Sequence, residues 1–163
     1  MFLIAFVVLG LPDFGHGVAW PDVRGTFDRP LADLGTFLAV QGLGDLGVAT
    51  STGRLAARWD IDRLVLGATG ATAAGLAVVA VAPSWQIVLA GGALYGAGAG
   101  GMDAGFNAAV ALRNDGRLMG LIHAGYGIGA AIGPVTVGVF LATGQGWRGA
   151  YGLFAVATAL VVV

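Results

Sequence analysis

Cysteine, lysine and glutamate are absent from this sequence of 163 residues. Without cysteine the chain can form no disulfide and offers no thiolate to a metal, and without glutamate it lacks the His-Glu pattern of zinc proteases. Charge is scarce as well, at 10% of residues against about 25% in a typical soluble domain. The net charge of −1 gives no reason to expect a nucleic-acid partner. We therefore predict no cofactor, no metal and no nucleic acid.

Apolar residues are abundant instead, at 57% of the chain, and the mean hydropathy is +0.85. A soluble protein of this composition would expose large apolar patches to water, so we predict that membrane lipid surrounds the chain. A transmembrane helix needs about 20 mostly apolar residues. Six segments qualify, at residues 1–20, 34–51, 64–82, 85–112, 118–143 and 147–163. The sequence thus predicts an all-α, multi-pass protein of the cell inner membrane or plasma membrane.

Tryptophan and arginine mark the ends of these segments. Trp20, Trp85 and Trp147 lie where amphipathic rings settle at the headgroup level. Arginine is more frequent after the second and fourth segments than after the first, third and fifth. The two sets are Arg54, Arg58, Arg63, Arg113 and Arg117, against Arg24, Arg29 and Arg148. By the positive-inside rule this bias predicts a cytoplasmic amino terminus.

Glycine is the most conspicuous small residue, with 30 copies. Three series step by four along predicted helices and so share one face each, where small residues let membrane helices approach closely. They are Gly67, Ala71 and Gly75; Gly92, Gly96 and Gly100; and Gly125, Gly129 and Gly133. We interpret all three as packing stripes.

The stretch Gly96–Gly101 also fits the G-x-G-x-x-G spacing of dinucleotide-binding loops. That motif requires a strand before it and a helix after it, within a βαβ unit. Here the preceding residues continue an apolar run far longer than a strand. We therefore reject a nucleotide-binding loop.

Ionisable residues inside predicted spans are candidates for function, because each costs at least about 2.5–3.5 kcal/mol to insert. Asp13 follows Pro12, which removes a backbone donor and favours a kink. His16 is three residues further on. This pair favours a face toward a polar cavity, and the alternative is a structural contact between Asp13 and His16.

A second polar group lies near the predicted cytoplasmic side. Asp103 and Asn107 are four residues apart and share one helical face, while His123 begins the next predicted helix. Together they predict either a substrate or proton site or a polar clamp between two helices. Asp45 has Gln41 one turn before it. It either lines the same cavity or faces a neighbouring helix, and we favour the second, structural role. Removing a carboxylate from water favours its neutral form, which is the physical basis of a proton-coupling hypothesis.

Four segments together resemble a known family. They are "GLPDFGHGVAWPD", "GAGAGGMDAGFNA", "RLMGLIHAGYGIGAAIGP" and "GWRGAY". The chain resembles the amino-terminal six-helix half of a major facilitator superfamily transporter, and more narrowly the fucose-permease-like members. The resemblance implies twelve helices in two halves, each built from inverted three-helix repeats, with helices one and four lining a central cavity. It implies that the chain is a fragment whose partner is the missing carboxy-terminal six-helix half.

The linker "GRLAARWDIDRL" resembles the cytoplasmic gating loop of that superfamily. The resemblance implies a gating role for Gly53, Arg54 and Arg58, although Ala57 replaces the acid usually found there. The alternative is that the arginines only set topology, and we give this the larger weight.

The sequence therefore predicts a secondary active transporter of a small polar solute, such as a sugar, by alternating access. Aromatic rings suit sugar faces, and the candidates are Phe14, Tyr95, Phe106 and Tyr126. The alternatives are an exporter of drugs or metabolites on the same fold, or a half-size membrane module that acts as a dimer. An intramembrane enzyme is disfavoured, because Ser51 and Ser84 lie in contexts typical of a helix end and a turn.

Overall fold

The computed structural model describes residues 2–51, 53, 60–111 and 116–161. Within these ranges the chain forms helices and no strand. The helices of this part are α1 (Phe2–Phe27), α2 (Asp33–Ala49), α4 (Ile61–Val81), α5 (Trp85–Ala111), α6 (Gly116–Ala142) and α7 (Gly146–Leu160). Each lies where the sequence predicts an apolar segment, so the all-α prediction is confirmed.

Three of the described helices, α1, α4 and α6, are long and apolar enough to cross a membrane by length and composition. The other three fall short of that criterion for different reasons. α2 has 17 residues and α7 has 15, fewer than the roughly 20 that a perpendicular span needs. α5 has 27 residues, but its many glycines dilute its hydropathy.

α1 continues beyond its predicted end near Trp20, as far as Phe27. The reason is tertiary contact with α7. The indole nitrogen of Trp147 donates a hydrogen bond of 3.1 Å to Thr26 Oγ1, and the ring of Phe27 packs against that of Trp147. These contacts hold the last turns of α1 in helical form although Pro21 lies inside them.

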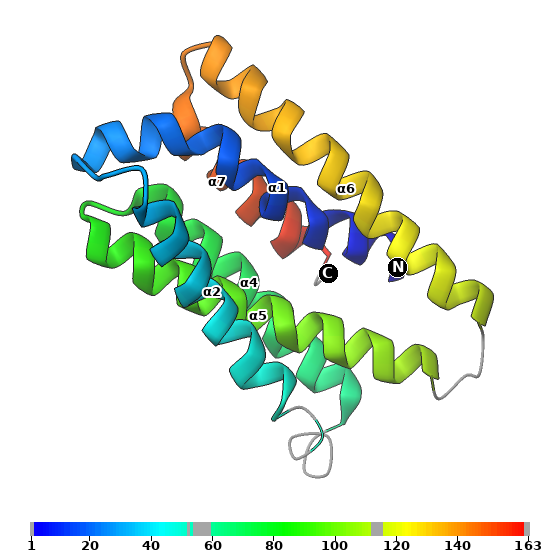
Figure 1. Cartoon of the computed structure of the whole chain (residues 1–163). Helices are drawn as coiled ribbons and strands as arrows, with labels where there is room; N and C mark the ends of the chain where they lie inside the picture. The colour runs from blue at the N-terminus through cyan, green and yellow to red at the C-terminus, as the bar shows by residue number, and fades with distance from the viewer. Residues whose placement is uncertain (1, 52, 54–59, 112–115, 162–163) are drawn as a thin grey trace.

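The helices form two groups of three (Figure 1). In one group α1 packs along α6 and also contacts α7. In the other, α5 packs against both α2 and α4. The main contact between the groups is that of α4 with α7. Each group thus combines helices from the first and second halves of the chain.

Glycines set the close approach within each group. A Cβ atom at Gly129 or Gly133 of α6 would overlap the backbone of α1. One at Gly96 or Gly100 of α5 would overlap the backbone of α2. The packing stripes predicted on these two helices are therefore confirmed.

Two other predictions about glycine have mixed outcomes. Gly96–Gly101 lies inside α5, which confirms that this stretch is not a phosphate-binding loop. The stripe predicted on α4 is only partly right. Gly75 lies against the backbone of α5, whereas nothing lies within 4 Å of a Cβ at Gly67, because Gly67 is on the exposed face of α4 while the neighbouring Ala68 packs against α5.

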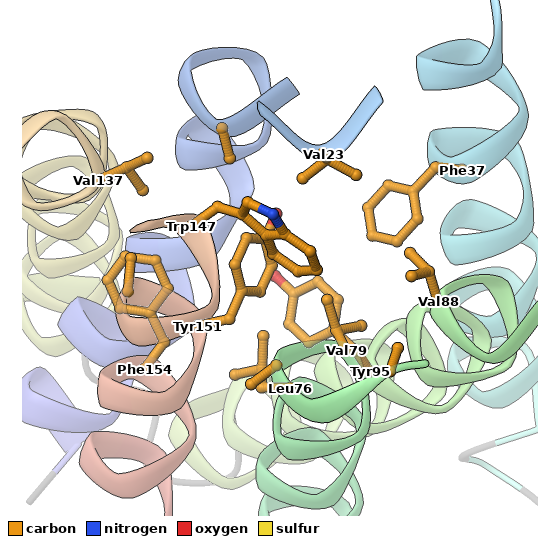
Figure 2. Close-up of a cluster of buried hydrophobic side chains, with 14 of the residues drawn as sticks. Val23, Phe37, Leu76, Val79, Val88, Tyr95, Val137, Trp147, Tyr151 and Phe154 are labelled. Carbon is orange, nitrogen blue, oxygen red and sulfur yellow. The ribbon is translucent and has the colours of Figure 1, made fainter. Parts of the chain in front are cut away.

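A core of buried side chains joins the two groups at the end of the bundle where α7 begins. Figure 2 shows its labelled members, which come from all six described helices. They are Val23, Phe37, Leu76, Val79, Val88, Tyr95, Val137, Trp147, Tyr151 and Phe154.

Arg148 ties α7 to the end of α4. Its two Nη atoms donate to the carbonyl oxygens of Ala80 at 3.0 Å and Ala82 at 2.7 Å. Its guanidinium carbon lies 4.5 Å from the centre of the Trp147 ring. These carbonyls have no partner within α4, so the cation both satisfies them and complements the negative end of the helix dipole.

We expect Arg148→Gln to lower the free energy of unfolding by about 2 kcal/mol, since hydrogen bonds from charged groups contribute roughly 1.5–3 kcal/mol. An unfolding titration with sodium dodecyl sulfate in mixed micelles measures the change. The matched control is Arg63→Gln, because Arg63 is exposed and lies 3.8 Å from Asp60 in an exposed pair. Equal losses in the two variants would contradict the capping role.

Candidate functional site

A cavity of about 280 Å³ lies between the two helix groups. Residues of α1, α2, α5 and α6 line it, toward the end of the bundle where α1 and α6 begin and α2 and α5 end. Its polar lining consists of Asp13, Asp45, Asp103, His123 and Tyr126, and the remaining lining is apolar. The first and fourth helices of the described chain, α1 and α5, both contribute, as the resemblance implies.

Asp13 is held by side chains from three other helices. Tyr95 Oη of α5 and Gln41 Nε2 of α2 both donate to its Oδ1, the latter at 3.2 Å. Tyr126 Oη of α6 donates to its Oδ2 at 2.7 Å. Both carboxyl oxygens of Asp13 are thus occupied by polar side chains. Asp13 is therefore fixed at the point where α1, α2, α5 and α6 meet.

The other acids face the open part of the cavity. Asp45, Asp103 and His123 are exposed, whereas Asp13 is half-buried. Asn107 Nδ2 donates to Asp103 Oδ1 at 3.0 Å, which confirms the predicted pair on one face of α5. Asp45, for which the sequence favoured a structural role, lines this same cavity.

His16 lies apart from the acidic cavity. Its side chain is 3% exposed and its Nδ1 lies 2.6 Å from Tyr151 Oη of α7. No hydrogen bond joins it to Asp13, so the alternative of a direct Asp13–His16 contact is wrong: each of them bonds to other helices. The structure thus brings Asp13, Asp103 and His123 together at one cavity, whereas His16 lies outside its lining and is linked to Asp13 through Gln41.

The aromatic candidates divide in the same way. Tyr126 lines the cavity, and Tyr95 is fully buried with its hydroxyl on Asp13. Phe106 lies in an apolar core, and Phe14 is 58% exposed and does not line the cavity. Two tyrosine hydroxyls on one carboxylate were not predicted. The sequence contained one indication that Tyr126 belongs to the site. It lies three residues after His123 and hence on nearly the same helical face.

Of the predicted gating residues, Gly53 is exposed, and Arg54 and Arg58 lie outside the described residues. In the part of the chain that the structure describes, no group of three or more His, Asp or Glu is placed to hold a metal ion. The chemistry that the cavity offers is hydrogen bonding and charge: carboxylates to accept, a phenol to donate, and an imidazole to do either.

Comparison with known proteins gives one match. Residues 2–163 match the family model described as Major Facilitator Superfamily. No curated protein and no solved structure matches the chain.

Proposed function

Since the chain belongs to the major facilitator superfamily and is a membrane transporter of that family, we propose that it moves a small polar solute by alternating access. The observation that carries this proposal is the cavity around Asp13. Its volume of about 280 Å³ is close to the lower end of the roughly 300–1,000 Å³ typical of small-molecule sites. The hydroxyls of a sugar would suit its carboxylates and the phenol of Tyr126, and the resemblance of the sequence to fucose-permease-like members also favours a sugar.

We also propose that all six described helices cross the membrane and form one half of a twelve-helix carrier. The grouping of helices supports inverted three-helix repeats. Exchanging α1 with α5, α2 with α6 and α4 with α7 converts the group α1–α6–α7 into the group α5–α2–α4. A carboxy-terminal six-helix half would then supply the opposite wall of the cavity. The alternative is that a second copy of this chain supplies that wall.

The cavity lies toward the end of the bundle that joins α2 to α4 and α5 to α6. These two linkers and the first turns of α4 and α6 together carry five of the eight arginines, so the positive-inside rule makes this end cytoplasmic. We propose that the described conformation faces inward, and that Gly53, Arg54 and Arg58 act in a cytoplasmic gate, as the sequence resemblance implies.

Asp13 is the proposed coupling residue, because protonation would remove the negative charge that three donors now stabilise. Uptake by the carrier in its full natural length, reconstituted in liposomes, tests this. We expect Asp13→Asn to lower initial uptake at least about tenfold, since one charge-assisted hydrogen bond is worth roughly 1.5–3 kcal/mol. Stimulation by a pH gradient should be lost as well.

Asp103→Asn should reduce uptake less, because Asp103 is exposed and has one described side-chain donor. Asp62→Asn is the matched control, as Asp62 is exposed in the first turn of α4, away from the cavity lining. Unchanged uptake and unchanged pH stimulation in both cavity variants would remove this site assignment.

A second candidate, an exporter of cationic drugs or metabolites, is favoured by one observation. Among the residues that the structure describes, the cavity lining holds three carboxylates and no arginine. Opposite charge at such a site favours a cationic solute. Competition in the uptake assay discriminates between the two. Inhibition by small organic cations and not by neutral sugars would favour the exporter, and the reverse would favour the sugar carrier.

A further inference from the structure

The second cavity differs from the first in size and surroundings. It measures about 10 Å³ and is lined by residues of α1, α2, α4, α5 and α7, most of them members of the core in Figure 2. It lies one turn and more beyond Asp13 along α1, where His16 and Trp20 point into it. Tyr95, whose hydroxyl bonds to Asp13, packs its ring edge-on against His16 at 6.0 Å and so stands between the two cavities.

Two polar atoms at this cavity lack partners. His16 Nε2 and Trp20 Nε1 are buried and have no partner in good hydrogen-bond geometry among the described residues, although the His16 ring interacts with the side chain of Gln41, whose Oε1 is also unpartnered. The two side chains are 3% and 4% exposed. Leaving a buried donor or acceptor unsatisfied costs about 1–3 kcal/mol, so native proteins rarely leave two such atoms at one cavity without a partner.

One water molecule would satisfy both atoms. A site for a single water needs about 10–15 Å³ of probe volume and two or more polar partners. The cavity meets both requirements and has no room for a larger ligand. We propose that it binds one internal water, which accepts a hydrogen bond from Trp20 Nε1–H and donates one to His16 Nε2.

This water would also fix the state of His16. With Nε2 as an acceptor, the neutral ring carries its proton on Nδ1 and donates it to Tyr151 Oη, 2.6 Å away. The water, His16 and Tyr151 then form one chain of hydrogen bonds from α1 to α7 inside the apolar core. His16 is in this way a structural hub of the core, separate from the solute cavity.

Nuclear magnetic resonance of indole ¹⁵N–H groups tests the proposal on the full-length carrier in detergent micelles. The Trp20 signal is assigned by its loss in Trp20→Phe. We expect the Trp20 indole proton to show a cross-peak to a long-lived water. Trp147 is the internal reference, because its indole donates directly to Thr26. Absence of a water cross-peak at Trp20 would overturn the proposal.

A second variant tests the placement of the water. Val23 lines the small cavity and is 6% exposed, so Val23→Leu should fill the space and abolish the Trp20 cross-peak. Val135→Leu, on a position of α6 that is 66% exposed, is the matched control and should leave the cross-peak intact. A cross-peak that survives in Val23→Leu would show that the water lies elsewhere. Neither readout depends on transport.

Discussion

Gly129→Ala is expected to destabilise the protein by about 3 kcal/mol, near the upper end of the usual cost of overpacking. A Cβ at this position would overlap the carbonyl oxygen of Val7, and would lie 2.8 Å from the Val7 carbonyl carbon and 3.2 Å from Gly10 Cα. All three atoms belong to the backbone of α1, so no side-chain rotation can relieve the overlap. The two helices would have to separate along their contact, which would also displace Asp13 from Tyr126.

The matched control is Gly127→Ala, two residues earlier on α6. Nothing lies within 4 Å of a Cβ at Gly127, and alanine is favoured over glycine in a helix by about 1 kcal/mol. This variant should be as stable as the original or slightly more so. Unfolding titrations in mixed micelles compare the two variants. If they prove equally stable, the contact between α1 and α6 is looser than the structure describes.

The positions of the helices followed from the sequence because they depend on local properties. Apolar runs of the right length, bounded by charges and by Trp20, Trp85 and Trp147, predict helices that are surrounded by lipid. This prediction depends little on tertiary contacts. The glycine series on α5 and α6 followed for a similar reason, since a four-residue step fixes a common face whatever the partner helix is. The partner itself, α2 for α5 and α1 for α6, did not follow.

The candidate site could be predicted only in part. Asp13, Asp103 and His123 were predicted from the rarity of ionisable residues in apolar segments, and that argument needs no knowledge of packing. Which way His16 faces depends on how α1 crosses its neighbours. His16 lies three residues after Asp13 and is turned toward α7, where it contacts Tyr151. No pattern in the sequence predicts that Tyr151 is its partner. Asp45 joins the cavity because α2 approaches α5 at Gly100, a contact between residues far apart in the chain.

Asp13→Ala should lower the free energy of unfolding by about 2–4 kcal/mol, because it leaves buried donors without an acceptor at about 1–3 kcal/mol each. Tyr95 is fully buried, and its hydroxyl and the Gln41 amide both donate to Asp13. Tyr126 is half-buried at the cavity and can turn to water, so it should add little to the cost. The control is Asp103→Ala. Because the carboxylate of Asp103 is exposed, its removal should leave the free energy of unfolding almost unchanged.

A double-mutant cycle separates this explanation from a simple packing defect. Tyr95→Phe alone should destabilise the protein, since it removes one donor from Asp13. In the Asp13→Ala background the same change removes an orphaned hydroxyl and should restore part of the lost stability. The two substitutions are then non-additive by well over the roughly 0.3–0.5 kcal/mol seen for independent sites. Additive losses would mean that the bond from Tyr95 does not hold Asp13 in place, and that its position depends on its other contacts, those with Gln41 and Tyr126.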